Sequence, residues 1–123
     1  MLLTVLKSKI HRARITGCSL DYMGSLTVDR ALMDAAGLIP YEKIGVANLA
    51  TGGRFDTYVI PGPAGSGVVE LNGAAARLGA AGDRVIVFAY AQIEPGETVA
   101  PRIVLVDDAN RAVESRAAGP PSD

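Results

Sequence analysis

Histidine and cysteine, two residue types that often perform catalysis, each occur only once in this chain. A single histidine, His11, and a single cysteine, Cys18, cannot build a multi-histidine metal site or a cage of several cysteines. No Gly-x-Ser-x-Gly nucleophile motif is present. The glycine-rich segment 61–67 lacks the Lys-Ser/Thr ending and the following helix of a phosphate-binding loop. Conventional hydrolysis and a phosphate-binding loop are therefore disfavoured.

One short motif, Tyr22-Met-Gly-Ser25, places a serine directly after a glycine. By itself, the pair Gly24-Ser25 is typical of a turn, because glycine adopts positive φ angles that other residues avoid. The other polar residues also have ordinary interpretations when each is taken alone. These interpretations are surface charges for Lys9 and Arg54, a β-forming residue for Thr57, a half-buried strand aromatic for Tyr58 and a turn for Asn72-Gly73.

Short strands separated by turns must position these residues. Near alternation of apolar and polar residues over 2–16 predicts a long first strand with one solvated face. Further strands are expected at 26–28, 43–50, 54–60, 68–71, 83–93 and 102–106. Turn residues at 51–53, 61–67 and 94–97 separate them. Six or more short strands at such spacing favour a small closed or nearly closed β-barrel.

Two short helices are expected between these strands. Asp29 is a good N-cap for a helix over 30–36, which Gly37 ends. A second helix over 74–78 follows Asn72-Gly73 and closes at two glycines, Gly79 and Gly82.

Length and charge restrict the class of protein. A chain of 123 residues can bury about two-thirds of its unfolded surface in one core, so we expect a single domain over 1–114. Residues 115–123 contain two prolines and small polar residues, so we expect a disordered tail there. A net charge of -1 without a Lys/Arg cluster argues against nucleic acid as a partner.

The sequence also bears on the compartment. A single cysteine fits a reducing cytoplasm better than secretion. The N-terminus becomes polar by Lys7, too early for a secretory signal. The longest apolar strand-like run, Val85–Ala91, is far shorter than the ~20 residues that span a bilayer as a helix. We therefore expect a cytoplasmic protein with no membrane partner.

Five motifs in fixed order resemble the pattern of the aspartate 1-decarboxylases, pyruvoyl-dependent enzymes that make β-alanine. The resemblance extends from Met1 to about Val113, and no matched position departs from the pattern. The motifs are Lys9-Ile-His11, Tyr22-Met-Gly-Ser25, Arg54-Phe-Asp-Thr-Tyr58, Asn72-Gly-Ala-Ala-Ala76 and Gly82-Asp83.

This resemblance implies a mainly β fold, a small double-psi β-barrel with two or more short helices, assembled as a homotetramer with active sites between subunits. It also implies a proenzyme that cleaves itself between Gly24 and Ser25. Residues 1–24 then form the β-chain and residues 25–123 the α-chain. Ser25 becomes a covalent pyruvoyl group, so the cofactor comes from the protein itself and no metal is required.

The resemblance further assigns roles in self-cleavage. The Ser25 hydroxyl would attack the Gly24 carbonyl, which needs near-attack geometry and stabilisation of the developing oxyanion. Gly24 is expected to adopt a strained backbone, and the Thr57 hydroxyl to bind the oxyanion. The resulting ester would undergo β-elimination and hydrolysis, with loss of ammonia, to leave a ketone at residue 25.

In turnover, the resemblance implies that L-aspartate forms a Schiff base with this ketone and loses its α-carboxylate as CO2. Tyr58 would return a proton, and Arg54 would bind a substrate carboxylate through its planar guanidinium. The resemblance further implies that the β-alanine supplies pantothenate and coenzyme A synthesis. The implied substrate-binding residues are Lys9, His11, Tyr22, Arg54, Thr57, Asn72, Gly73, Ala74 and Ala75.

The alternative is a non-catalytic β-barrel binding module that is never cleaved, since a fold does not fix a function. A module has no need to retain Gly24-Ser25 together with Thr57, Tyr58 and Arg54. Two fragments on a denaturing gel would support the enzyme, whereas a single band would support the module or an unprocessed proenzyme.

Overall fold

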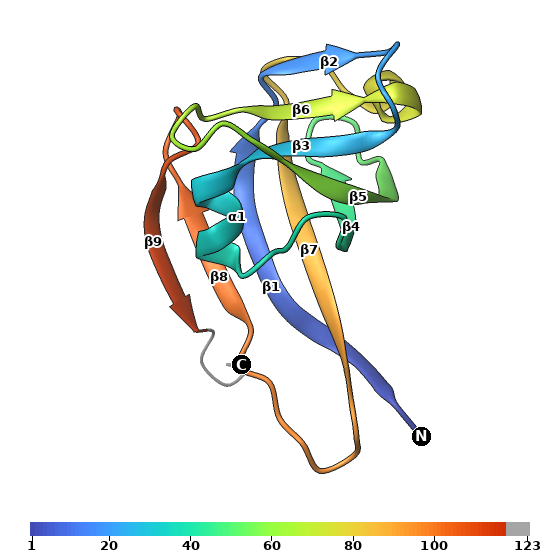
Figure 1. Cartoon of the computed structure of the whole chain (residues 1–123), viewed down its shortest axis with the longest axis vertical. Helices are drawn as coiled ribbons and strands as arrows, with labels where there is room; N and C mark the ends of the chain where they lie inside the picture. The colour runs from blue at the N-terminus through green and yellow to red at the C-terminus, as the bar shows by residue number, and fades with distance from the viewer. Residues whose placement is uncertain (118–123) are drawn as a thin grey trace.

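The fold is mainly β, as predicted, and contains one nine-stranded sheet (Figure 1). The computed structural model describes residues 1–117. The strand order is β2-β6-β3-β5-β4-β7-β1-β8-β9. The strands are β1 (Leu3–Arg14), β2 (Gly17–Ser19), β3 (Ser25–Asp29), β4 (Lys43–Asn48), β5 (Arg54–Gly62), β6 (Val69–Asn72), β7 (Arg84–Ile93), β8 (Arg102–Val106) and β9 (Ala112–Ala117).

The sheet curls back on itself at the junction between β1 and β2. Only two residues separate these strands, although β1 and β2 are far apart in the strand order. Ile15 donates its N–H to the carbonyl of Asp83, directly before β7, and Thr16 donates to the carbonyl of Val69 in β6, both at 2.8 Å. This junction therefore joins two distant parts of the sheet, as a small β-barrel requires. The double-psi topology stays a prediction.

β3 occupies the centre of one half of the sheet. It runs parallel to β5, with Leu26 opposite Val59, and antiparallel to β6, with Ser25 opposite Asn72. The first residue of β3 is thus fixed by backbone pairing with β6, and the next residue by pairing with β5.

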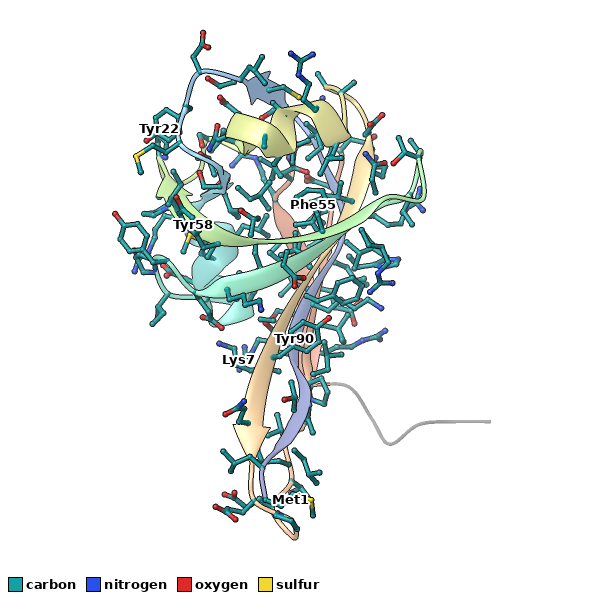
Figure 2. All side chains as sticks on the ribbon, turned by 90° about the vertical axis from the view of Figure 1, so that its right-hand side faces the viewer. Met1, Lys7, Tyr22, Phe55, Tyr58 and Tyr90 are labelled. Atoms are coloured by element: carbon teal, nitrogen blue, oxygen red, sulfur yellow. The ribbon has the colours of Figure 1, made fainter. Side chains whose placement is uncertain are left out.

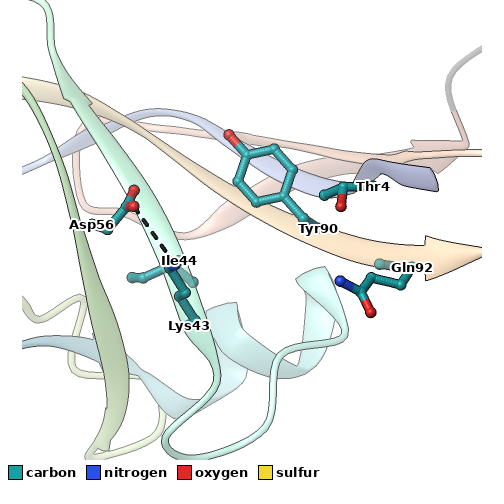
Figure 3. Close-up of a pocket in the computed structure, with 7 residues that line it drawn as sticks. Thr4, Lys43, Ile44, Asp56, Tyr90 and Gln92 are labelled. Carbon is teal, nitrogen blue, oxygen red and sulfur yellow. Dashed lines mark ion pairs between the residues drawn. The ribbon is translucent and has the colours of Figure 1, made fainter. Parts of the chain in front are cut away.

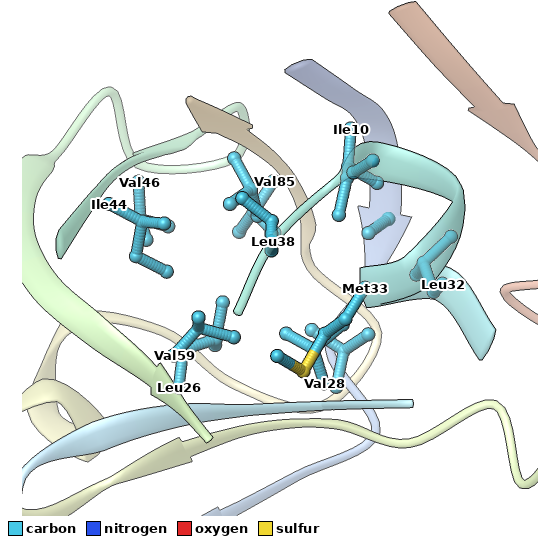
Figure 4. Close-up of a cluster of buried hydrophobic side chains, with 14 of the residues drawn as sticks. Ile10, Leu26, Val28, Leu32, Met33, Leu38, Ile44, Val46, Val59 and Val85 are labelled. Atoms are coloured by element: carbon cyan, nitrogen blue, oxygen red, sulfur yellow. The ribbon is translucent and has the colours of Figure 1, made fainter. Parts of the chain in front are cut away.

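The core fills the space inside the curled sheet, and Figure 4 shows part of it. Strand alternation supplies most of its apolar side chains, and the short helix α1 (Arg30–Ala36) closes one opening with Leu32, Met33 and Ala36. The strand residues of this core are Ile10, Ala13, Leu26, Val28, Ile44, Val46, Val59, Val69, Leu71, Val85, Val87, Ala89 and Val104.

The helix α1 begins and ends where the sequence predicts. Asp29 caps it by accepting the N–H of Ala31 at 2.8 Å, and Gly37 ends it in the left-handed conformation. The two carboxylate oxygens of Asp29 also accept the N–H groups of Gly65 at 2.9 Å and Gly67 at 2.8 Å. One buried side chain thus organises both the helix and the glycine-rich loop.

β1 and β7 extend beyond the barrel as a two-stranded arm, formed by Leu3–Leu6 and Tyr90–Ile93 (Figures 1 and 2). The arm carries apolar side chains that the barrel does not cover. Leu3 is 43% exposed and Tyr90 is 44% exposed, and Met1 and Leu2 before the arm are exposed as well.

The structure differs from the expected elements at several boundaries. Ser115–Ala117, expected in the tail, belong to β9, which pairs antiparallel with β8. All side chains of β9 are exposed, so composition gave no sign of a strand held by backbone pairing. The rest of the expected tail, residues 118–123, lies outside the described residues.

Two further elements differ in detail. β5 continues through Pro61 to Gly62, because the parallel pairing with β3 extends to Asp29 opposite Gly62. The second helix is a 3-10 helix, η1 (Gly73–Leu78). No helix within residues 1–117 has the length and apolar character needed to cross a membrane.

Candidate active site

A cavity of about 290 Å³ opens beside the first residue of β3, and we name it the Ser25 cavity. It brings together three of the residues expected in the site, which are Tyr22, Ser25 and Tyr58. Figure 2 shows Tyr22 and Tyr58 on the same side of the barrel, away from Tyr90. The full lining is Tyr22, Met23, Ser25, Tyr41, Tyr58, Ile60 and Pro61.

Ser25 is fully buried at the wall of this cavity. Its Oγ donates to the carbonyl oxygen of Met23 at 3.1 Å and accepts from Nδ2 of Asn72 at 2.9 Å. The same Asn72 amide donates to Oγ1 of Thr27 at 2.8 Å, on the same face of β3. Asn72, itself buried, therefore fixes the position of the serine hydroxyl directly.

Gly73 lies against the expected cleavage site. Its φ is +63°, and a Cβ built there would lie 2.7 Å from both the Cα and the N of Gly24. Any side chain at residue 73 would therefore displace the segment before Ser25. Gly73 begins η1, which also carries Ala74, exposed, and Ala75, buried.

Gly24 does not show the strained backbone that we expected. Its φ lies outside the left-handed region, and a Cβ on it would meet no heavy atom within 4 Å. The close packing at this position belongs to Gly73, so the constraint on the cleavage segment is steric and comes from its neighbour.

Tyr58 and Tyr41 form the aromatic side of the Ser25 cavity. Their ring centroids are 6.0 Å apart and their planes are tilted by 41°, within the range of favourable aromatic pairs. The sequence predicted Tyr58 but not Tyr41.

Tyr41 has an unusual backbone. The N–H of Glu42 donates to the carbonyl of Ile39 at 3.2 Å, which closes a turn with Pro40 at its second position and Tyr41, φ +68°, at its third. This is the pattern of a type II turn, whose third position favours glycine or asparagine. A left-handed backbone costs other residues about 1–2 kcal/mol. A proline followed by a bulky residue between α1 and β4 was the available sequence signal.

Thr57 does not line the Ser25 cavity. Side chains alternate along β5, so Tyr58 and Ile60 share the cavity face while Thr57 lies on the opposite face with Phe55 and Val59, which contact the core. Among the hydrogen bonds of residues 1–117, none joins the Thr57 side chain to Gly24 or Ser25. Its oxyanion role stays a prediction.

Arg54 and Lys9 lie elsewhere on the sheet. Both cations lie over the ring of Phe88 in β7, with Arg54 Cζ 5.2 Å and Lys9 Nζ 5.9 Å from its centroid. Arg54 lines a separate hollow of about 210 Å³ together with Tyr90. Neither Arg54 nor Lys9 lines the Ser25 cavity, so one chain does not bring the expected substrate-binding cations to Ser25.

His11 lines a third hollow, of about 430 Å³, beside Arg12 and Arg84. Burial lowers the pKa of His11 below its ordinary value, and the positive charges of Lys9 and Arg12 lower it further. Both effects favour the neutral imidazole. His11 does not line the Ser25 cavity either.

Another hollow, of about 340 Å³, lies on the outer face of β4, β5 and β7 (Figure 3). Lys43 Nζ and Asp56 Oδ2 face each other there at 3.8 Å, and both side chains are exposed. Such a pair contributes little to stability. No residue expected in the site lines this hollow. Within residues 1–117, no group of three or more His, Cys, Asp or Glu side chains could bind a metal ion.

Comparison with known proteins gives a consistent result. The family model described as aspartate decarboxylase matches residues 1–113. The aspartate 1-decarboxylase of Pelotomaculum thermopropionicum is 56% identical over 118 residues, which cover 94% of this chain and 89% of the relative. The enzyme of Syntrophobacter fumaroxidans is 59% identical over 109 residues, 87% and 88% of the two chains. That of Lactiplantibacillus plantarum is 53% identical over 113 residues, 90% and 87%.

Proposed function

Because this chain belongs to the aspartate decarboxylase family, we propose that it removes the α-carboxylate of L-aspartate as CO2 and releases β-alanine for pantothenate and coenzyme A synthesis. The chain is a decarboxylase, an enzyme of the lyase class. One observation supports the proposed decarboxylation of L-aspartate most directly. The Ser25 hydroxyl is buried and adjoins a cavity with room for an amino acid.

Ser25 is the precursor of the pyruvoyl cofactor in this proposal. The surroundings of Ser25 support its conversion, because Asn72 Nδ2 donates to Oγ and holds the attacking hydroxyl in place, and Tyr58 lines the same cavity. A pyruvoyl group supplies a ketone that binds the substrate amine and accepts the electrons released with CO2. None of the twenty side chains provides such an electrophile.

Self-cleavage forms this group in the proposal. Ser25 Oγ attacks the carbonyl carbon of Gly24, and the amide C–N bond breaks to give an ester and a free amine. β-Elimination then breaks the Cβ–Oγ bond and leaves Gly24 with a carboxylate. Water replaces the nitrogen of residue 25, which leaves as ammonia. Gly73 supports this step, because its packing against Gly24 restricts the segment that must be attacked.

Tyr58 acts as the proton donor in turnover. Its side chain lines the Ser25 cavity from β5, where it can return a proton to the carbon that has lost its carboxylate. Tyr22, from the segment before the cleavage site, also lines the cavity and restricts the substrate.

The proposal also includes a homotetramer with active sites shared between subunits. Two observations support it. Arg54 and Lys9 lie outside the Ser25 cavity of their own chain, so a neighbouring copy can supply them to the substrate carboxylates. The rim of the cavity is also apolar and exposed, with Tyr22 at 54% and Met23 at 77%. We further propose a cytoplasmic location, which a chain with one free cysteine fits.

Intact-mass analysis tests the proposal. The expected result is a 1–24 fragment and a second fragment lighter by one ammonia than simple hydrolysis would leave, in a preparation that converts L-aspartate to β-alanine. Ser25→Ala should remain one chain and be inactive. Thr57→Val, which keeps the shape but removes the hydroxyl, should stall before cleavage. An active preparation of uncut chain only would refute the pyruvoyl mechanism.

A further inference from the structure

We propose that Tyr41 is a positioning residue, which orients the proton donor Tyr58 in the Ser25 cavity. The inference rests on the proposed function of Tyr58 and adds a residue outside the motifs that define the site. It starts from a conflict between the backbone of Tyr41 and its residue type.

Tyr41 occupies a backbone position that glycine or asparagine would fill without strain. Its side chain is 75% exposed, so burial in the core does not compensate for that strain. The ring instead packs against Tyr58, with 6.0 Å between the ring centroids, and Tyr41 lines the Ser25 cavity. A strained residue at the wall of a candidate site is a reason to look for a functional role.

Backbone hydrogen bonds join this turn to β5 next to Tyr58. The N–H of Tyr41 donates to the carbonyl of Val59 at 2.8 Å, and the N–H of Val59 donates to the carbonyl of Glu42 at 3.0 Å. The positions of the two tyrosines are therefore fixed relative to each other by main-chain contacts on both sides of Tyr41.

The carboxylate of Glu42 stabilises the turn through two contacts. Its Oε1 accepts the N–H of Ile39 at 3.1 Å, and its Oε2 pairs with Lys7 Nζ at 2.5 Å. The Tyr41 ring thus projects from a turn that is held at both ends, and it restricts the rotation of Tyr58.

Such a restriction matters for proton transfer. A general acid must keep its hydroxyl within hydrogen-bond reach of the reacting carbon or of one bridging water. Tyr58 is only half-buried, and in residues 1–117 its hydroxyl has no hydrogen-bond partner that would fix the ring. The tilted contact with Tyr41 supplies the constraint through the ring alone, so the Tyr41 hydroxyl is not required.

Two variants of the mature, cleaved enzyme test this role. Tyr41→Phe keeps the ring and should leave kcat within about twofold of the parent. Tyr41→Asn removes the ring and suits the left-handed backbone. It should lower kcat about 3- to 10-fold, as expected for the loss of one aromatic pair, with KM little changed and an equal or higher melting temperature. Stability and kcat then change in opposite directions, which a merely structural residue does not produce.

Ile39→Asn provides the matched control. It changes an exposed apolar side chain in the same turn, and Ile39 does not line the Ser25 cavity. Its kcat should equal that of the parent. Intact masses of all variants check that each has been cleaved to the same extent.

The double variant Tyr41→Asn/Tyr58→Phe makes the test specific. If Tyr41 acts through the Tyr58 hydroxyl, Tyr41→Asn should have no further effect on kcat once that hydroxyl is gone. An equal loss of kcat in both backgrounds, a rise in KM alone, or an unchanged kcat in Tyr41→Asn would each overturn the inference while the parent remains active. An uncut, inactive parent would instead overturn the proposed function, and this inference with it.

Discussion

Gly73 is the residue whose replacement should most directly affect maturation. A methyl group on Gly73 would overlap the backbone of Gly24, so Gly73→Ala should slow self-cleavage at least tenfold and reduce stability. The left-handed backbone alone contributes about 1–2 kcal/mol to that loss of stability. A time course of fragment formation measures the first effect and urea unfolding the second.

Gly52→Ala separates the two effects. Gly52 has φ +77°, and a Cβ there would meet nothing within 4 Å. This variant should lose similar stability yet cleave at the parental rate. If Gly73→Ala cleaves as fast as Gly52→Ala, the packing of Gly73 on Gly24 has no part in maturation.

Replacement of Arg54 by lysine should lower activity although it keeps the positive charge. Its guanidinium lies over the Phe88 ring, which orients the planar fork that two parallel hydrogen bonds to a carboxylate require. Arg54→Lys should lower kcat/KM for aspartate about 5- to 150-fold, equivalent to about 1–3 kcal/mol, and leave self-cleavage intact. Arg30→Lys, in an exposed pair with Asp34, is the control. An unchanged kcat/KM in Arg54→Lys would exclude it from carboxylate binding.

At the scale of elements, Asp29 joins α1, β3 and the glycine-rich loop. Burial opposes its charged form, but hydrogen bonds from the N–H groups of Gly67, Gly65 and Ala31 outweigh this effect and lower its pKa. A group whose pKa is lowered on folding stabilises the protein above its unfolded pKa, about 3.9. That contribution is lost as pH falls through the folded pKa.

Asp29→Asn should therefore destabilise the protein by about 1–3 kcal/mol at pH 7. The amide keeps one acceptor, but its NH2 group would face either the N–H of Gly67 or those of Ala31 and Gly65. Urea unfolding at pH 7 and pH 3, in the uncut Ser25→Ala background, measures the difference, which should shrink at pH 3. The exposed Asp34→Asn is the control. An equal loss at both pH values would contradict the role of the charge.

The sequence predicted those elements whose signal is local. The cap at Asp29, the stop at Gly37 and the strand 54–60 follow from residue type and alternation, and the structure confirms them. β2 and β9 were missed, because three residues carry no periodicity and a fully exposed edge strand has no apolar face. Their stability comes from pairing with β6 and β8, which local patterns do not encode.

The residues of the candidate site divide in the same way, into those that local motifs identify and those whose role depends on the three-dimensional arrangement. Motifs identified Ser25, Tyr58 and Tyr22, which the fold brings to one cavity. They could not show that Arg54, the first residue of β5, lines a different hollow from Tyr58 of the same strand, since the neighbours of a side chain across the sheet are not encoded locally. Tyr41 escaped notice because its significance lies in its backbone conformation and in a contact across the turn.

At the scale of the whole molecule, the separation of Ser25 from Arg54 predicts complementation between inactive variants. Ser25→Ala and Arg54→Ala are each expected to lack activity, whereas their coexpression should restore about a quarter of it. The reason is that a site shared between two subunits combines the intact Ser25 of one with the intact Arg54 of the other in about one case in four.

Light scattering of the same samples should report about four chain masses. The control is coexpression of Ser25→Ala with Tyr58→Phe, two residues that line one cavity and should not complement. A fully active monomer, or no recovery by Ser25→Ala with Arg54→Ala, would contradict a shared site.

The position of residue 24, between β2 and β3, has a consequence for refolding. In the proposed maturation, cleavage after Gly24 turns β1 and β2 into a separate peptide, although β1 lies between β7 and β8 and β2 pairs with β6. The barrel of an uncut chain can form in a unimolecular reaction before subunits assemble, but the mature protein, once denatured, must first bind β1, an interior strand of its sheet, from solution. Recovery of native structure after denaturation should then fall more steeply on dilution for the mature protein than for the uncut Ser25→Ala chain. The proposed maturation would thus give the enzyme its electrophile and at the same time remove the covalent link that guided its folding.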